Sequence, residues 1–265
     1  MNTKKILTQY DINPSRRLDQ HFLIDDRIAQ RQIDYANITD SDIILEIGAG
    51  IGILTEKIEK LAKKVYAVEI DKRLCEVLSK RCENTEIICE NFLKVDLPRF
   101  DKVVANLPYS LSSKITFKLF DYDFRLGVLM YQNEFAARMI AKPCSKEYSR
   151  LSVNTQYFSD IKLLEVVPKT AFHPRPKVKS AIVELIPRKP PFEVSDRQFF
   201  FRLVTAIFSQ RRKKLRGALI NSAHLLKIED MDEAILSLPD DLLERRPGEL
   251  TPEELAKVAN RFCGL

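Results

Sequence analysis

The sequence predicts an α/β fold: a Rossmann-like, mostly parallel sheet with an antiparallel edge, followed by a small all-helical domain. Strand-like runs alternate with helical segments over the first two thirds of the chain, which is typical of βαβ units. A glycine-rich loop joins the first of these strands to the next helical segment. A proline-rich segment then separates this region from a stretch in which only helical patterns occur.

Strand-like runs are expected at 43–47, 64–69, 86–89, 102–105 and 126–131. Between several of them, apolar residues recur with helical spacing, most clearly at 55–62 and 71–81. Two later strand-like runs, 162–167 and 180–186, have no clear helix between them. These two runs are therefore predicted to form an antiparallel addition at the edge of the sheet.

The segment 187–191 contains three prolines and two cations, a composition that suits an exposed connection. Beyond this segment the sequence predicts only helices, at 196–220, 230–238 and 251–262. We therefore expect a larger α/β domain over residues 1–190 and a helical domain over residues 191–265.

The chain has 265 residues and a formal net charge of +6 at pH 7. This moderate positive charge only slightly favours a polyanionic partner. No apolar run approaches the roughly 20 residues that a membrane-spanning helix needs, and the N-terminus lacks the apolar core of a secretion signal. We therefore expect a cytoplasmic protein without membrane association.

The five cysteines form no C-x-x-C pair, and no histidine lies near them in sequence. Zinc sites usually need such spacing, so no metal site is expected. Free cysteine packs as a small hydrophobe. Buried free thiols are therefore predicted for Cys75, Cys82, Cys89, Cys144 and Cys263.

Three of the seven glycines, Gly48, Gly50 and Gly52, fall within five positions between a predicted strand and a predicted helix. Glycine is needed where backbone turns sharply or approaches a ligand closely. The spacing G-x-G-x-G is neither the dinucleotide-binding pattern nor a Walker motif. Glu69 follows about 20 residues later, where a carboxylate accepts hydrogen bonds from the cis-diol of a ribose. The alternative is a tight turn followed by Asp71 as a helix cap.

A second motif, Asn106-Leu107-Pro108-Tyr109, ends another predicted strand. Pro108 holds the chain extended, which lets the Asn106 side-chain carbonyl and the Leu107 backbone carbonyl face one pocket. Two acceptors suit an amino group with two protons to donate, and Tyr109 offers a flat face for a base taken out of its stack. Activation of such an amine rests on positioning, so no general base is required. Taken in isolation, the motif also fits an ordinary strand-end turn.

The glycine loop and the acid together resemble the cofactor site of class I S-adenosylmethionine-dependent methyltransferases. The resemblance implies that the backbone at Gly48 contacts the methionine moiety and that Glu69 holds the ribose. In that fold an acid at the end of the next strand meets the adenine amine. The aligned residue here is Asn91, an uncharged amide, and Glu90 beside it is the alternative.

Further elements, in order along nearly the whole chain, resemble the ribosomal small-subunit RNA adenine dimethyltransferase family. Residues 18–24, with the sequence LDQHFLI, are similar to the family's N-terminal Q-N/H-F-L element. This similarity implies that His21 and Leu23 line the cofactor. Residues 171–178 are similar to the F-x-P-P-P-K-V element, with Arg175 in place of the middle proline.

The same resemblance implies that Phe172 stacks on the target adenine opposite Tyr109. Residues 208–219 open the helical domain in the family's manner and carry five cations within six positions, on a helix whose other face is expected to be apolar. A charge run alone is more often a solvated helix end, but in this context it is expected to neutralise RNA phosphates. The residues expected to contact RNA are Arg211, Arg212, Lys213, Lys214 and Arg216.

The cofactor implied is S-adenosylmethionine, bound in the domain 1–190, with RNA recognition in the domain 191–265. The residues expected to bind it are His21, Leu23, Glu46, Gly48, Gly50, Gly52, Glu69, Ile70, Glu90, Asn91 and Asn106. The residues expected at the reacting amine are Asn106, Leu107, Pro108, Tyr109 and Phe172. The implied reaction is N6,N6-dimethylation of two adjacent adenosines near the 3′ end of small-subunit ribosomal RNA, with a role in ribosome biogenesis. The implied partner is the small ribosomal subunit or its precursor, and a monomer is expected.

Three alternatives remain open from the sequence. One is an adenine methyltransferase that acts on large-subunit ribosomal RNA, which the helical domain and the 18–24 element disfavour. Another is a ribosome-assembly or RNA-binding factor that has lost the reaction, which the intact Asn106–Tyr109 motif disfavours. The weakest is a DNA adenine methyltransferase, since such enzymes usually carry proline where Leu107 stands and an added DNA-recognition domain.

Overall fold

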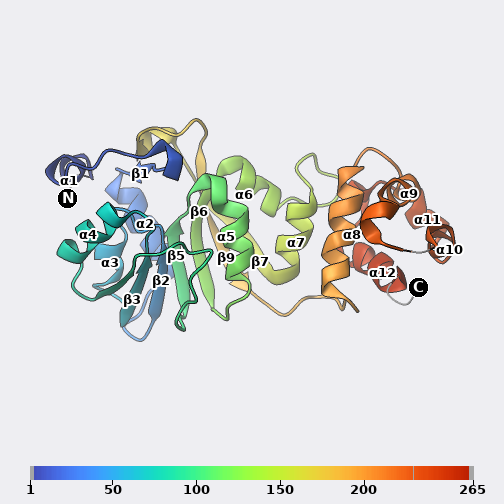
Figure 1. Cartoon of the computed structure of the whole chain (residues 1–265), viewed down its shortest axis with the longest axis horizontal. Coiled ribbons are helices and arrows are strands. Elements are labelled where there is room, and N and C mark those ends of the chain that lie inside the picture. Colours follow the sequence, from blue (N-terminus) through green and yellow to red (C-terminus); the bar gives the residue numbers. More distant parts are fainter. Residues whose placement is uncertain (1–2, 229, 263–265) are drawn as a thin grey trace. The chain divides into compact units, whose positions relative to one another are not determined.

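The computed structural model describes residues 3–228 and 230–262. The chain divides into two compact units. The first comprises Met1–Ala136 and Asp160–Pro187, and the second comprises Ala137–Ser159 and Arg188–Leu265. The first unit is built around a sheet, and the second consists of helices and their connections (Figure 1).

The first unit contains a seven-stranded sheet with the order β4-β3-β2-β5-β6-β9-β7 (Figure 1). Its strands are β2 (Ile43–Ile47), β3 (Lys64–Val68), β4 (Thr85–Ile88), β5 (Lys102–Asn106), β6 (Leu126–Gln132), β7 (Ser159–Val167) and β9 (Ser180–Pro187). From β4 across to β6 all neighbours are parallel, whereas β9 pairs antiparallel with β6. The predicted mostly parallel sheet with an antiparallel edge is confirmed.

The strand order reverses between β2 and β5, because the chain continues from β2 to β3 and β4 before it returns to β5. At such a point the connections after two adjacent strands run to opposite sides, which opens a crevice at their carboxyl ends. Helices cover both faces of the sheet: α2 (Asp26–Ala36), α3 (Thr55–Ile58) and α4 (Lys72–Arg81) on one face, and α5 (Ser112–Leu119) on the other. Strands β2 and β5 are therefore buried on both faces rather than on alternate residues only.

A two-stranded antiparallel sheet joins β1 (Phe22–Leu23) to β8 (Phe172–His173), with Leu23 opposite Phe172. This pairing brings the 18–24 element next to the 171–178 element, a proximity that no local pattern in the sequence predicts. Before β1 lie α1 (Thr3–Gln9) and the 3-10 helix η1 (Arg16–Leu18); the hydroxyl of Thr3 donates to the Leu23 carbonyl at 2.8 Å. The remaining elements of this region are η2 (Tyr109–Leu111), α6 (Asn133–Met139) and η3 (Lys169–Ala171).

The second unit is helical, as predicted for the C-terminal region. Its elements are α7 (Arg150–Phe158), α8 (Arg197–Ser209), α9 (Leu215–Leu226), α10 (Met231–Leu236), α11 (Asp240–Leu243), η4 (Pro247–Glu249) and α12 (Pro252–Phe262). The segment Ala137–Ser159, which the sequence analysis placed in the larger domain, packs here because Tyr148, Val153 and Tyr157 join the hydrophobic core of the C-terminal helices. Within the described ranges, no helix is both long and apolar enough to cross a membrane.

The single helix predicted over 196–220 is wrong, because α8 ends at Ser209 and α9 begins at Leu215. In the turn between them, the Leu215 backbone N–H donates to the Arg245 carbonyl at 2.7 Å. The turn lets α9 fold back against α8, so that Ile207 and Leu219 bury their side chains in one core. The predicted cationic cluster therefore lies mainly in an exposed turn rather than along a helix.

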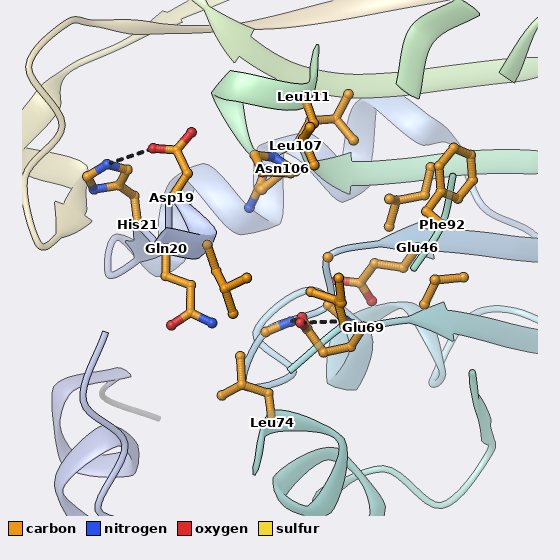
Figure 2. Close-up of a pocket in the computed structure, with 18 of the residues that line it drawn as sticks. Asp19, Gln20, His21, Glu46, Glu69, Leu74, Phe92, Asn106, Leu107 and Leu111 are labelled. Carbon is orange, nitrogen blue, oxygen red and sulfur yellow. Dashed lines mark hydrogen bonds and ion pairs between the residues drawn. The ribbon is translucent and has the colours of Figure 1, made fainter. Parts of the chain in front are cut away.

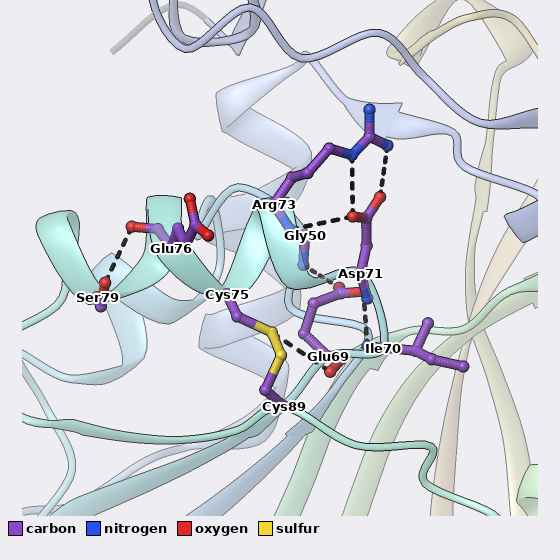
Figure 3. The surroundings of a disulfide bond; sticks show 9 residues. All are labelled: Gly50, Glu69, Ile70, Asp71, Arg73, Cys75, Glu76, Ser79 and Cys89. Atoms are coloured by element: carbon purple, nitrogen blue, oxygen red, sulfur yellow. Dashed lines mark hydrogen bonds and ion pairs between the residues drawn. A yellow bond between two sulfur atoms is a disulfide. The ribbon is translucent and has the colours of Figure 1, made fainter.

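The prediction of free thiols is wrong for Cys75 and Cys89, which form a disulfide bond with a Cα–Cα distance of 6.0 Å (Figure 3). The two residues are brought together because the start of α4 lies beside the carboxyl end of β4, a proximity that their 14-residue separation does not reveal. Cys82 is a buried free thiol, as predicted, whereas the free Cys144 is exposed. Cys263 lies outside the described residues.

Candidate active site

One cavity lies where β2, β3 and β5 end, at the point where the strand order reverses (Figure 2). Of the residues predicted to bind cofactor or substrate in the larger domain, those that line it are His21, Leu23, Glu46, Gly48, Gly50, Glu69, Ile70, Glu90, Asn91, Asn106, Leu107, Pro108, Tyr109 and Phe172. Gly52 does not line it. A Cβ on Gly52 would lie 3.2 Å from Leu78 Cδ2, and its φ is +89°. Glycine is thus needed at 52 for helix packing and backbone conformation rather than for contact with a ligand.

Glu69 follows β3 and anchors the glycine loop from within the cavity (Figure 2). Its Oε2 accepts a hydrogen bond from the Gly50 backbone N–H at 2.9 Å, and its Oε1 accepts from the N–H groups of Ile70 and Asp71 at 2.8 and 2.9 Å. Burial raises the pKa of Glu69, while these backbone N–H donors act in the opposite direction. A carboxylate oxygen has more than one lone pair, so this side chain retains acceptor capacity toward the cavity.

Glu46 is the second acid of the cavity and belongs to β2. The residue is 2 % exposed, and its Oε2 has no hydrogen-bond partner in the part of the chain that the structure describes. Burial, with a smaller contribution from the charge of Glu69, raises the pKa of Glu46 to about 8. An unpartnered buried carboxyl is costly, which indicates that this end of the cavity is built for a polar or cationic ligand group.

Asn106 is the last residue of β5, and its Oδ1 is buried without a hydrogen-bond partner among the described residues. Leu107 is held next to it by a hydrogen bond from its N–H to the Met130 carbonyl at 3.3 Å. Pro108 has φ −63° and ψ 124°, so the chain is extended as the sequence predicts. A Cβ on Gly48 would lie 3.7 Å from the Asn106 carbonyl oxygen, so the glycine loop approaches this strand end closely.

Tyr109 and His21 form the aromatic border of the cavity. Their rings are stacked, with centroids 5.9 Å apart and an interplanar angle of 25°. The Tyr109 hydroxyl lies 2.5 Å from Ser180 Oγ, and burial raises the pKa of Tyr109. His21 Nδ1 lies 2.8 Å from the Pro174 carbonyl oxygen, and His21 Nε2 lies 3.7 Å from a carboxylate oxygen of Asp19 (Figure 2). Because a carbonyl oxygen only accepts, Nδ1 carries the proton in this arrangement.

The segment after β4 supplies Glu90 and Asn91 to the cavity. Asn91 uses its side-chain oxygen to accept a hydrogen bond from the Leu93 backbone N–H at 3.0 Å. This bond closes a local turn, so the Asn91 side-chain oxygen stabilises the chain at the position predicted to contact the adenine amine of the cofactor. Glu90 is exposed, which leaves its carboxylate available to a ligand.

Phe172 lines the cavity but is only 3 % exposed, because β8 packs it among core residues of the first unit. Sequence reasoning did not single out Asp19 and Gln20, which also line the cavity. Asp19 accepts a hydrogen bond from the Ser110 backbone N–H at 2.9 Å, and Gln20 donates to Asp71 at 3.0 Å. Both residues lie inside the 18–24 element, and this position could have indicated that they line the cavity.

The predicted RNA-contacting cations of the second unit differ from one another in their surroundings. Arg211 donates to the carbonyl oxygens of Ser145 and Lys146 at 3.1 and 2.7 Å. Lys214 pairs with Glu244, and Arg216 pairs with Asp240 at 3.1 Å. Arg212 and Lys213 are exposed, and within the described residues their side chains have no such partner.

The Rossmann-like sheet, its glycine loop and the acid after β3 define the class of protein, an S-adenosylmethionine-dependent methyltransferase. Residues 12–248 match the model of the family described as "Ribosomal RNA adenine dimethylase". The chain belongs to this family.

The chain is 55% identical to "Probable ribosomal RNA small subunit methyltransferase A" of Methanosarcina acetivorans, over 99% of this chain and 98% of that protein. It is 44% identical to the protein of the same description from Methanosphaera stadtmanae, over 97% of both chains. Its structure is similar to a dimethyladenosine transferase from Plasmodium falciparum, with a TM-score of 0.78, 33% identity, and 90% of this chain and 96% of that one covered. It is also similar to the 23S rRNA methyltransferase ErmE, with a TM-score of 0.65, 25% identity, and 91% and 99% covered.

Proposed function

We propose that the protein transfers methyl groups from S-adenosylmethionine to the N6 amines of two adjacent adenosines near the 3′ end of small-subunit ribosomal RNA, giving N6,N6-dimethyladenosine at each. The observation that carries this proposal is the buried, unpartnered Oδ1 of Asn106, which lines the cavity beside Tyr109. The substrate is the small ribosomal subunit or its precursor, so the reaction belongs to ribosome biogenesis. The names of the archaeal relatives support this choice of subunit.

The cavity fits the cofactor because its polar groups complement those of S-adenosylmethionine. Glu69 accepts from the ribose hydroxyls, and the backbone at Gly48 and the carboxyl of Glu46 face the methionine moiety. Glu90 is the better candidate for the adenine amine, since Asn91 already uses its carbonyl oxygen in a turn. His21, Leu23, Gly50 and Ile70 complete the lining. The bound cofactor supplies an electrophilic methyl group on a sulfonium sulfur.

The chain's own contribution to the reaction is to position the target amine. The amine donates one N–H to Asn106 Oδ1 and the other to the Leu107 carbonyl, which Pro108 holds extended. Two such bonds direct the nitrogen lone pair toward the methyl group, so rate is gained from orientation and from stabilisation of developing positive charge. Tyr109 stacks on the base, and Phe172 closes the cavity from the core side. After the first transfer one bond to Asn106 suffices to orient the monomethylated amine for the second.

Recognition of the RNA is assigned mainly to groups outside the cavity. Arg212 and Lys213 are free to contact phosphates, whereas Arg211, Lys214 and Arg216 have partners within the chain. The helical unit acts as the RNA-recognition domain and the unit that contains the sheet as the catalytic domain. The protein works as a monomer in the cytoplasm.

The test is tritium transfer from labelled S-adenosylmethionine to unmethylated small ribosomal subunits, followed by mass spectrometry of the nucleosides. The expected product is N6,N6-dimethyladenosine at two adjacent positions. Labelling of large-subunit RNA or DNA instead would show that the protein is a methyltransferase with a different nucleic-acid substrate. Binding to subunits without transfer of a methyl group to any RNA would contradict the proposed enzymatic function and favour a ribosome-assembly factor.

A further inference from the structure

Five exposed cations without acidic partners lie in two segments that adjoin residues of the active-site cavity. Arg16 and Arg17 belong to η1, and Arg175, Lys177 and Lys179 belong to the segment between β8 and β9. Across residues 3–228 and 230–262, none of these five side chains takes part in an ion pair or a hydrogen bond. They are therefore full positive charges that face solvent.

These two groups of cations lie far apart in sequence but meet at the aromatic border of the cavity. The pairing of β1 with β8 joins the segments that carry these cations. His21, which follows η1, contacts the Pro174 carbonyl oxygen directly before Arg175. Tyr109 contacts Ser180 directly after Lys179. Segments that carry these cations thus adjoin both His21 and Tyr109.

The absence of counter-charges contrasts with the rest of the first unit. There, acids pair with many of the cations: Arg27 with Asp25, Lys57 with Asp26, Arg31 with Glu165, Lys64 with Glu86, Arg73 with Asp71, and Lys102 and Arg125 with Asp42. At the cavity border, Asp19 instead accepts from the Ser110 backbone N–H and faces His21. The cations of this border are left for a partner that brings its own negative charge.

The segment that carries three of the cations is held in place. Pro174 and Pro176 fix two of its φ angles, and Pro176 is buried. The Lys179 carbonyl accepts a hydrogen bond from the Asn133 backbone N–H at 2.9 Å. A segment fixed before binding loses little entropy when it contacts phosphates.

We propose that Arg16, Arg17, Arg175, Lys177 and Lys179 form a phosphate-binding rim that holds the RNA strand on both sides of the target adenosine. This proposal rests on the proposed function and extends it to the substrate contacts of the same site. A base must leave its stack to reach the cavity, which costs a few kcal/mol. Phosphate contacts beside the cavity offset this cost and position the strand without reading its sequence. The rim belongs to the first unit and is separate from Arg211–Arg216 in the second.

The test compares two triple variants that remove the same charge. The rim variant is Arg175→Ala/Lys177→Ala/Lys179→Ala. The control is Lys60→Ala/Lys63→Ala/Lys80→Ala, three exposed lysines near the amino ends of β3 and β4, at the opposite edge of the sheet. Fluorescence anisotropy measures the Kd for a labelled RNA hairpin with two adjacent adenosines in its loop, at several KCl concentrations. Calorimetry measures S-adenosylmethionine binding, and thermal unfolding checks the fold.

The rim variant is expected to bind the hairpin about tenfold more weakly, with a slope of log K against log salt that is smaller by about 2 to 3. Its cofactor affinity is expected to stay within about twofold, because the cations do not line the cavity. The single variant Arg175→Pro, which restores the family's proline and removes one cation, is expected to reduce the slope by about 1.

The proposal that these cations bind RNA would be contradicted if the rim variant kept the wild-type RNA affinity and salt slope. It would also be contradicted if the control variant lost as much RNA affinity as the rim variant. A wild-type protein that does not bind the hairpin would contradict it as well. If the wild type binds RNA but transfers no methyl group to small subunits, the proposed function is contradicted. The anisotropy comparison still tests whether the rim cations contact RNA. The two proposals are therefore separable.

Discussion

The Glu69 carboxylate and the Gly50 backbone N–H are joined by a hydrogen bond of 2.9 Å. The bond ties the loop after β2 to the end of β3, so the shape of the glycine loop depends on the carboxylate that we assign to the ribose. The other carboxylate oxygen is fixed by the N–H groups of Ile70 and Asp71. Because three donors hold the group before any ligand arrives, it needs little reorganisation when a diol binds.

Glu69→Gln is expected to weaken S-adenosylmethionine binding by about 10- to 100-fold. Whichever way the amide is turned, its NH2 group faces a backbone N–H that also donates, so the loop loses an anchor and the ribose loses an acceptor. Isothermal titration calorimetry measures the change. Glu86→Gln, which alters an exposed carboxylate of β4 outside the cavity, serves as the control. Equal affinities for the two variants would remove Glu69 from the cofactor site.

Glu46 is expected to make the stability of the cofactor-free protein fall as the pH rises. Burial raises its pKa to about 8 from an ordinary value of 4.5, so between these values the folded state holds a proton that the unfolded state has lost. The free energy of unfolding then decreases with increasing pH, by up to about 1.4 kcal/mol per unit. Urea unfolding from pH 5 to 8.5 measures this slope. The Glu46→Gln profile should be flatter, and parallel profiles for wild type and variant would contradict the assignment.

Asn106→Ala is expected to abolish methyl transfer while leaving S-adenosylmethionine affinity within a few-fold. The side chain is assigned mainly to the target amine, and its Oδ1 makes no hydrogen bond with the described residues. Removing it therefore breaks no hydrogen bond among the described residues. Single-turnover transfer and calorimetry, run on the same preparation, separate the two effects. Retained turnover accompanied by a large loss of cofactor affinity would instead assign Asn106 to the cofactor alone.

The sheet and most of the cavity residues could be predicted from the sequence because short, continuous stretches of residues identify them. The glycine spacing, the position of Glu69 and the Asn106–Tyr109 motif each lie at the end of a strand that its own composition identifies. Parallel strands bring their carboxyl ends to one edge, so residues that are distant in sequence converge without further information.

The features that were missed depend on contacts between distant segments. The disulfide of Cys75 and Cys89 follows from how α4 packs beside β4, and the pairing of Leu23 with Phe172 from two strands of two residues each. Neither leaves a periodic pattern in the sequence. The break before Leu215 was missed because no proline or glycine marks it, although residues 209–214 contain no apolar side chain. The turn there allows α9 to pack against α8 in one hydrophobic core.

Within the cationic turn between α8 and α9, Arg212 and Lys213 are expected to provide the RNA contacts. Arg212→Ala/Lys213→Ala should weaken binding to RNA of any sequence and reduce the salt slope by about 2, measured by anisotropy over a range of KCl concentrations. Lys257→Ala/Arg261→Ala, two exposed cations of α12, removes the same charge elsewhere in the unit and should leave both quantities nearly unchanged. Arg211→Ala should instead lower the melting temperature, because this guanidinium satisfies two backbone carbonyls. If the double variant retains the wild-type slope, the turn is a solvated surface and RNA recognition lies elsewhere on the protein.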